Sequence, residues 1–416
     1  MNRTMPITVL LLMVVCWCVP TQGADKKGAF AQEAELTDSN ASAFAELGFS
    51  VSTNGNTVAA TTGGAVDIYV EPTGGWADLT APTAQLTVSG DSLNYVCISG
   101  NVIAATGLSG VAYVYVMPTG GWGNSSQPNA VLTASDQAVF TNVAISGNLV
   151  VAASPTADGA QSQTGAAYAF VMPVSGWTNM TETAKLTASD GVTDDRFGVS
   201  VSVSAATVLI GAPDATVGGS CPKQCLLFQG AAYVFVKPDQ GWVTMTQTAK
   251  LYTRDGGPGD NFGGSVSVND NGATVLIGAS QQDTVTRPGA AYIFSRPGAT
   301  WKNSSQYTAK LTASNGEKFG WFGFSVALSG SSTKTALVSS VDGFVGSNLS
   351  QGAVYVFVEP SGGWKTAKQT AIIKASDGTV GDVFGQSVAV NGSTIAVGAP
   401  YHAVGSNKGQ GAAYIF

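Results

Sequence analysis

One short motif recurs along most of the chain and constrains its fold more than any other feature. The motif is Gly-Ala-x-Tyr-x-[Phe/Tyr] or a close variant, and successive copies start roughly 45–65 residues apart. Its seven copies begin at Gly64, Gly110, Gly165, Gly230, Gly289, Gly352 and Gly411. Repeats of this length are typical of β-propeller blades. The spacing therefore predicts one repetitive domain over residues 25–416 rather than several unrelated ones.

Each copy contains four segments with the composition of short β-strands. The first has the pattern Phe-Gly-x-Ser-Val-x-Val, as in residues 262–268 and 384–390, and an Asn-Gly or Ser-Gly hairpin turn usually follows it. The second reads TVLIGAP and is apolar on both faces, as expected of a strand covered by neighbouring blades. The third is the counted motif, and the fourth, T-x-T-AKLTAS, follows a turn that ends in Trp. This pattern predicts an all-β protein, a seven-bladed β-propeller of four-stranded antiparallel blades.

The two ends of the repetitive region complement each other. The last copy stops at Phe416, after its third strand, and lacks the Trp turn and the AKLTAS segment. Residues 34–37, Ala-Glu-Leu-Thr, have the pattern of a fourth strand and precede the first copy. We expect the N-terminal strand to complete the seventh blade and close the ring.

Two further signatures mark the unit that runs from Ala184 to Trp242. Phe197-Gly198 begins its first strand segment, and Gly211-Ala212-Pro213 ends its second. The unit resembles the FG-GAP repeat family, which builds the head of integrin α-chains and occurs in many secreted bacterial proteins. The resemblance covers about residues 34–416 and implies a propeller with a role in recognition or adhesion. The early copies depart from it, since Leu47 replaces the Phe of the first Phe-Gly pair.

The N-terminal residues 1–24 have the pattern of a secretory signal. Arg3 supplies a positive start, ITVLLLMVVCWCV an apolar core, and Gly23 and Ala24 small residues for cleavage. The alternatives are a signal anchor and a lipoprotein modified at Cys16 or Cys18. No later apolar stretch reaches the roughly 20 residues of a membrane span. We expect a secreted, extracellular or cell-surface protein.

Charge excludes one class of partner, and cysteine usage fits the secretory route. The net charge is −7, and no Lys/Arg cluster offers the electrostatic footprint of a nucleic-acid site. Cys221 and Cys225 lie four residues apart in a glycine-containing loop, and an oxidising compartment favours a disulfide between them. A metal site is the weaker alternative because no second Cys/His pair accompanies them.

Paired aspartates occur where one copy passes to the next, in the pattern Asp-Gly-x-x-x-Asp. The pairs are Asp190 with Asp195, Asp255 with Asp260, and Asp377 with Asp382. Some FG-GAP blades carry a calcium loop of the form D-x-D-x-D-G-x-x-D, so the resemblance makes calcium the candidate cofactor. The pattern here is shorter than that, and Ca²⁺ needs six to eight oxygen ligands. The alternative is a turn in which the carboxylates bind backbone N–H groups, with no cofactor.

Catalytic motifs are scarce in this sequence. A Ser/His/Asp or Cys/His arrangement would have to use His402, the single histidine, which we expect to be solvated in the last loop. Paired carboxylates also serve glycoside hydrolysis, but a catalytic pair should be unique, whereas these pairs recur from copy to copy. We therefore expect no enzyme. A propeller enzyme acting on polysaccharide would need a unique group of charged side chains at the mouth of the central channel.

The long, variable loops between second and third strands are the candidate binding surface. In a four-stranded antiparallel blade these loops and the crossings to the next blade emerge at the same rim, and variable loops on a rigid scaffold usually carry binding. The sequence thus predicts a secreted, non-enzymatic recognition or adhesion module for an extracellular protein or glycan. A purely structural envelope or matrix protein is the remaining alternative.

Overall fold

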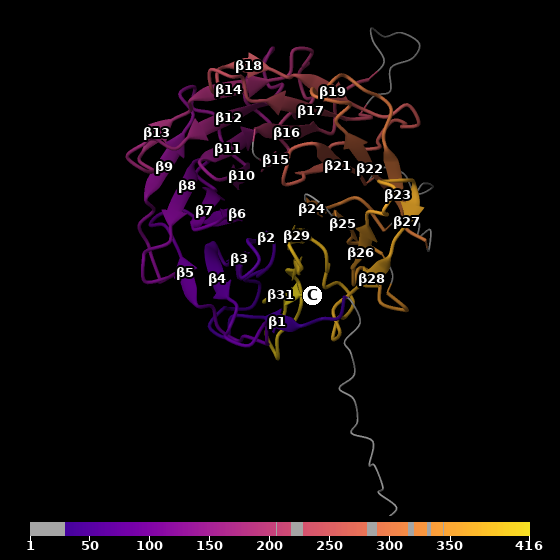
Figure 1. Cartoon of the computed structure of the whole chain (residues 1–416). Coiled ribbons are helices and arrows are strands. Elements are labelled where there is room, and N and C mark those ends of the chain that lie inside the picture. Colours follow the sequence, from indigo (N-terminus) through magenta and orange to yellow (C-terminus); the bar gives the residue numbers. More distant parts are fainter. Residues whose placement is uncertain are drawn as a thin grey trace, which may run out of the picture.

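Seven small β-sheets form a ring around a central axis (Figure 1). The computed structural model describes residues 30–204, 206–217, 228–280, 289–314, 320–330, 334–343 and 345–416. The predicted signal at residues 1–24 and the predicted Cys221–Cys225 disulfide lie outside these ranges. Within them, no helix is long and apolar enough to cross a membrane. The predicted seven-bladed β-propeller is confirmed.

Four antiparallel strands make up each blade, and the first of them lies nearest the axis (Figure 1). Blade 1 consists of β2 (Val51–Thr53), β3 (Thr57–Thr62), β4 (Ala65–Val70) and β5 (Ala84–Leu86). Blade 2 consists of β6 (Leu93–Ser99), β7 (Val102–Gly107), β8 (Ala112–Val116) and β9 (Ala130–Thr133). Blade 3 consists of β10 (Asn142–Ser146), β11 (Leu149–Ser154), β12 (Ala166–Val171) and β14 (Ala184–Thr187).

The remaining four blades repeat this order. Blade 4 consists of β15 (Ser200–Ser204), β16 (Thr207–Ala212), β17 (Ala231–Val236) and β19 (Ala249–Leu251). Blade 5 consists of β20 (Ser265–Val268), β21 (Thr274–Ala279), β22 (Ala290–Ser295) and β23 (Ala309–Thr312). Blade 6 consists of β24 (Val326–Ser329), β25 (Thr335–Ser340), β26 (Ala353–Val358) and β28 (Ala371–Ile373). Blade 7 consists of β29 (Ser387–Asn391), β30 (Thr394–Ala399), β31 (Ala412–Ile415) and β1 (Ala34–Leu36).

The second and third strands are buried on both faces because they lie between two neighbouring blades. All six residues of β16 are buried, and one hydrophobic cluster joins side chains from blades 3 and 4. Phe197, at the start of blade 4, contacts Tyr233 and Phe235 of β17 edge-on, with ring centroids 5.4 and 6.0 Å apart. Equivalent aromatic groups recur in blades 5, 6 and 7. The repeated aromatics are buried and form the core, and each contributes roughly 1.5–3 kcal/mol to stability.

The Phe-Gly pair precedes the first strand instead of belonging to it. Residues 262–268 were expected as one strand, but β20 begins only at Ser265. Gly263 adopts a φ of +94°, a left-handed conformation that glycine tolerates and other residues rarely adopt. The turn at Gly263 places the chain against Ala212 and Ala231 of the preceding blade before β20 begins.

The predicted ring closure is confirmed. Strand β1 pairs antiparallel with β31, and Glu35 lies opposite Tyr414 (Figure 1). The Gln32 side chain accepts a hydrogen bond from the backbone N–H of Ser376, at 3.0 Å. Gln247 makes the same bond to Ser189 between blades 4 and 3. The N-terminal segment therefore takes the same place and register as the fourth-strand segments of the other blades.

Each Trp turn also links its blade to the preceding one. The residue two positions after the Trp accepts a hydrogen bond from a backbone N–H in the preceding fourth strand. These acceptors are Asp78, Asn124, Asn179, Thr244, Asn303 and Thr366. Short parallel strands follow in three blades, namely β13 (Met180–Thr181), β18 (Met245–Thr246) and β27 (Ala367–Lys368). These contacts cover strand edges that would otherwise be open to pairing with other chains.

Candidate functional site

The loops between second and third strands and the crossings between blades lie together at one rim. In blade 3, the Thr193 hydroxyl of the crossing donates to the backbone oxygen of Ser162 in the loop, at 3.1 Å. Near blade 6, the Gly381 N–H donates to the backbone oxygen of Leu349, also at 3.1 Å. The opposite rim carries the hairpin turns and the Trp turns, as the Trp301 indole N–H donating to Gly272 shows. We call the first surface the loop rim.

Exposed apolar side chains gather on the loop rim. Within the described residues, eleven large hydrophobic side chains are exposed, and eight of them belong to its loops and crossings. The eight are Phe44, Leu108, Val139, Val192, Phe228, Leu349, Val380 and Tyr401. Two others, Val174 and Val243, lie at the opposite rim, and Ile372 lies on an outer strand. Exposed apolar groups concentrated in one region are typical of interaction surfaces.

Each predicted aspartate pair divides into a buried and an exposed member. Asp195, Asp260 and Asp382 are buried, and their carboxylates accept hydrogen bonds from the backbone N–H three residues earlier. In the first, the distance from the Val192 nitrogen to Asp195 Oδ2 is 2.9 Å. Burial raises the pKa of Asp195, against the opposing effect of this hydrogen bond. The second aspartate of each pair thus holds the turn ahead of Phe-Gly.

The first aspartates of two pairs bind lysines of the following blade. Asp190 Oδ2 lies 2.6 Å from Lys250 Nζ, and that ammonium lies 5.3 Å from the centre of the Tyr233 ring. Asp255 and Lys310 repeat the arrangement at 2.7 Å. Burial lowers the pKa of Lys310, but the hydrogen bond to Asp255 and the neighbouring Tyr292 outweigh it and raise that pKa.

A further Asp–Lys–Tyr group was not predicted. Asp136, Lys185 and Tyr168 form it in blade 3, with 2.6 Å between the Lys185 ammonium and the Asp136 carboxylate. The sequence feature that indicates this group is the recurring Ala-Lys-Leu segment of the fourth strand, whose lysine lies opposite the motif Tyr.

These groups do not fit a bound calcium ion. The exposed carboxylates of Asp190 and Asp255 are already paired with ammonium groups, and the buried ones of Asp195 and Asp260 bind their own turns. Calcium takes six to eight oxygen ligands, and the two engaged carboxylates of each crossing, even with the exposed Asp194 of the first, do not provide them. The described residues of these two crossings form a structural arrangement in which lysine supplies the positive charge.

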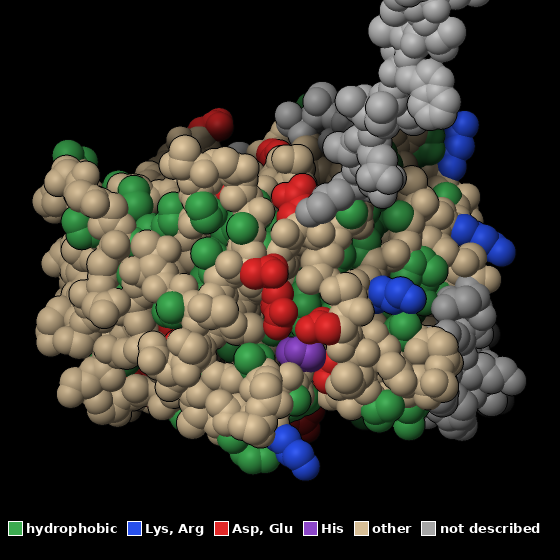
Figure 2. Space-filling view, turned by 90° about the horizontal axis from the view of Figure 1, so that it is seen from below, with side chains coloured by type: hydrophobic (Ala, Val, Ile, Leu, Met, Phe, Trp, Pro, Cys, Tyr) green, Lys and Arg blue, Asp and Glu red, His purple; other side chains and the backbone are tan. Residues whose placement is uncertain are grey.

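The third pair, in the closing blade, is different. Asp377 faces Glu35 and His402 where blades 3, 4 and 5 have lysine, and its Oδ1 accepts a hydrogen bond from the Tyr414 hydroxyl at 3.1 Å. His402 was expected to be solvated, which is wrong: its side chain is only 7% exposed, and its Nδ1 lies 2.9 Å from Asp382 Oδ2. The loop after Ala399 turns back over the crossing and buries the ring. In Figure 2 the histidine lies among Asp and Glu side chains at the molecular surface.

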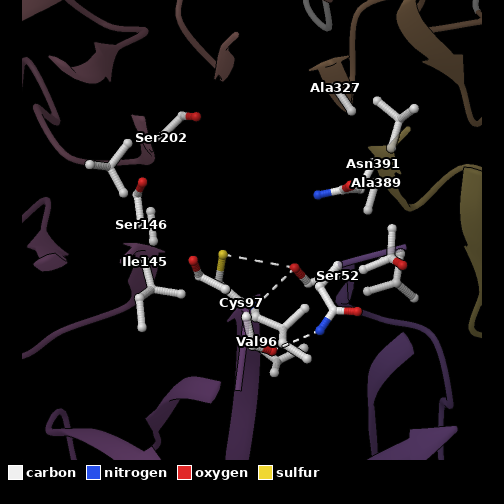
Figure 3. A pocket seen from close by; sticks show the side chains of 18 of the residues that line it. Ser52, Val96, Cys97, Ile145, Ser146, Ser202, Ala327, Ala389 and Asn391 are labelled. Atoms are coloured by element: carbon white, nitrogen blue, oxygen red, sulfur yellow. Dashed lines mark hydrogen bonds between the residues drawn. The ribbon is translucent and has the colours of Figure 1, made fainter. Parts of the chain in front are cut away.

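Small side chains of the innermost strands line the central channel (Figure 3). Its larger cavity has a volume of about 880 Å³, and its described lining residues include one charged side chain, Asp270. A second cavity of about 410 Å³ is likewise lined by one charged residue, Arg196. The unique charged group that a polysaccharide enzyme would need at the channel mouth is not formed by these lining residues.

Serines in the channel wall join neighbouring blades. Ser52 and Ser202 accept hydrogen bonds from the backbone N–H groups of Ile98 and Val268, each at 3.1 Å. The Ser52 hydroxyl also lies 3.8 Å from the thiol sulfur of Cys97 (Figure 3). Cys97 is partly exposed and lines the cavity, and the protein around its sulfur shields it from water, which raises the pKa of the thiol. The serines of the first strands therefore serve packing between blades.

Comparison with known proteins supports the architecture. The solved structure entitled "Structure of Dos1 propeller" matches with a TM-score of 0.51 and 12% sequence identity, covering 88% of this chain and 81% of that one. At this identity the likeness concerns the fold alone. No curated protein sequence matches the chain.

Half of the chain matches one described sequence family. The pattern of the FG-GAP repeat matches residues 180–235, 245–294, 306–357 and 367–416. These ranges begin at the Trp turn ahead of blade 4 and extend to the end of β31, the region in which Phe-Gly pairs are intact. With seven blades in place and these four repeats matched, the chain belongs to the FG-GAP repeat family.

Proposed function

We propose that this chain is a secreted recognition module that binds an extracellular partner through the loop rim. The observation that carries the proposal is the concentration of exposed apolar side chains there, eight of the eleven in the described residues. Leu108 and Phe44 are 69% and 73% exposed, and burial of such groups is the main driving force of protein association. The predicted secretory signal supports an extracellular location.

A protein partner suits this rim better than a glycan. Aliphatic side chains such as Leu108, Val139 and Leu349 offer apolar area without hydrogen-bonding groups. Interfaces between proteins bury apolar groups at their centre and polar groups around it. The Asp–Lys pairs lie beside the apolar loops and provide such a polar surround. Adhesion is the biological role that this binding would serve.

Binding to panels of extracellular proteins and glycans tests the proposal. The purified chain over residues 25–416 should bind one or more proteins saturably. A variant with Leu108→Ser and Val139→Ser should lose at least tenfold in affinity. The matched control replaces Val174 and Val243, exposed at the opposite rim, by serine and should bind as the parent does. Equal loss in both variants, or binding to glycans alone, would contradict the proposed protein-binding rim.

A further inference from the structure

Three potential metal ligands meet at the seam where the ring closes. Glu35 lies on β1, Asp377 in the crossing that enters blade 7, and His402 in the loop between β30 and β31. Their ligand atoms lie within 4.8 Å of one another, and no other group of three or more such side chains occurs within the described ranges. Segments from opposite ends of the chain therefore contribute to one site.

The imidazole of His402 is held in the orientation of a metal ligand. Its Nδ1 lies 2.9 Å from Asp382 Oδ2, and a carboxylate in this place accepts the Nδ1 proton and leaves the Nε2 lone pair free. Nε2 lies 3.4 Å from Asp377 Oδ2 and 3.8 Å from Glu35 Oε1. The ring is 7% exposed, and no hydrogen bond joins Nε2 to another described residue.

These separations suit a shared ion better than direct hydrogen bonds. Hydrogen bonds between nitrogen and oxygen have lengths of about 2.7–3.2 Å. Ligands bound tetrahedrally at about 2.0–2.1 Å lie about 3.3 Å from each other. Asp377 and Glu35 are 44% and 27% exposed, so an ion can enter from the solvent and one coordination position can hold water.

Comparison with the other blades shows what this site lacks. Glu35 lies opposite Tyr414 in the register that Lys185, Lys250 and Lys310 occupy opposite Tyr168, Tyr233 and Tyr292. In those blades the ammonium balances the carboxylate of the crossing. In blade 7 a second carboxylate replaces it. Buried and partly buried charges are normally paired or bound to a metal, so these carboxylates need a positive partner, which either a bound metal ion or a protonated His402 would supply.

We propose that Glu35, Asp377 and His402 bind one divalent transition-metal ion, for which zinc is the best fit. Zinc accepts imidazole nitrogen and carboxylate oxygen together, and a three-ligand set with an open position is common for it. Calcium and magnesium prefer oxygen ligands alone. The ion links β1 to the last loop and the last crossing and so fastens the closure of the ring, with Asp382 as the positioning residue.

Zinc titration of the metal-free chain tests the site. Calorimetry should give one zinc ion per chain, and zinc should raise the melting temperature because it binds only the closed ring. Glu35→Lys installs the residue of the equivalent blades; it should abolish binding while the chain remains folded. Asp377→Asn should weaken binding at least tenfold, and Asp382→Asn about 10–100-fold.

The control is Asp190→Asn, which breaks an equivalent ion pair in another blade and should leave zinc binding unchanged. Absence of zinc binding by the parent chain overturns the proposal. Zinc binding that survives Glu35→Lys and Asp377→Asn also overturns it, because the ion is then held elsewhere, for example by cysteines. The proposal is also overturned if Glu35→Lys melts at a higher temperature than the parent and zinc does not change the melting temperature of the parent. That result would identify a cluster of unpaired carboxylates without a metal.

Discussion

Gly211, the first residue of the Gly-Ala-Pro signature in blade 4, lies directly against the backbone oxygen of Gly263 in blade 5. A Cβ added to Gly211 would lie 1.9 Å from that oxygen. The same contact joins Gly278 to Gly323 and, across the ring closure, Gly398 to Gly48. The two signatures of the repeat are therefore the two sides of one contact between blades, where the Phe-Gly turn of one blade rests on the second strand of its neighbour.

Gly211→Ala should destabilise the protein by about 1–3 kcal/mol, the usual cost of forcing an extra methyl group into a packed site. The added methyl group would clash with a backbone oxygen, and no change of side-chain rotamer can relieve that clash. Gly123→Ala is the matched control, since no atom lies within 4 Å of a Cβ built there. Urea unfolding of both variants measures the difference, and equal midpoints would refute the proposed contact.

Removal of residues 25–40 should open the ring, because it deletes β1 and leaves β31 as an unpaired edge. Leu36 is fully buried between the first and last blades, so its loss alone removes a core side chain. We expect a lower melting temperature and elution as larger, associated species, since exposed edges pair with other chains. A shorter deletion of residues 25–29 retains β1 and is the control. A 25–40 deletion that melts and elutes like the parent would disprove closure by this strand.

Blade number, strand order and ring closure could be predicted from the sequence because they follow from a repeated spacing. The departure of Leu47 from the Phe-Gly pattern did not prevent the first blade from forming, since Leu47 is buried and Gly48 still contacts Gly398. In a repeat protein, the fold of a copy with an altered motif can still be predicted from the copies that retain the motif.

The chemistry at the seam could be predicted only in part. Alignment of Ala34-Glu35-Leu36 with Ala249-Lys250-Leu251 would have revealed a carboxylate in a lysine position. The burial of His402 could not have been found in this way, because it depends on a loop of one blade folding over Asp382 in the preceding crossing. Contacts of this kind join unique segments, and repetition gives no information about them.

Asp67 should make the protein less stable as the pH rises from about 4 to 7. In blade 1, Asp67 occupies the position of the motif Tyr. Burial raises its pKa to about 7. The hydrogen bond from Gln85 opposes this shift, and the charge of Asp38 adds to it. An unfolded Asp releases its proton near pH 4. Between these values the unfolded state loses the proton and the folded state keeps it, so stability falls with pH and levels off above 7.

Asp67→Asn keeps the Oδ1 acceptor for Gln85 and removes the charge. The variant should gain stability over the parent by an amount that grows between pH 4 and 7, to on the order of a few kcal/mol. Unfolding curves of both proteins at pH 4, 5, 6 and 7 provide the difference, from which the titration of all other groups cancels. A difference that does not change with pH would show that the buried carboxyl is not the cause.

Asn303→Ala should weaken the link between blades 4 and 5. The Asn303 side-chain oxygen accepts a hydrogen bond from the Lys250 N–H at 2.8 Å, and loss of such a bond costs about 0.5–1.5 kcal/mol. Asn303→Thr is the matched control, because Thr244 and Thr366 make the equivalent bond in other blades, at 3.2 Å. Thermal unfolding should therefore show a lower midpoint for alanine and a parental one for threonine. If threonine lowers the midpoint as much as alanine, the acceptor does not determine the stability of this contact.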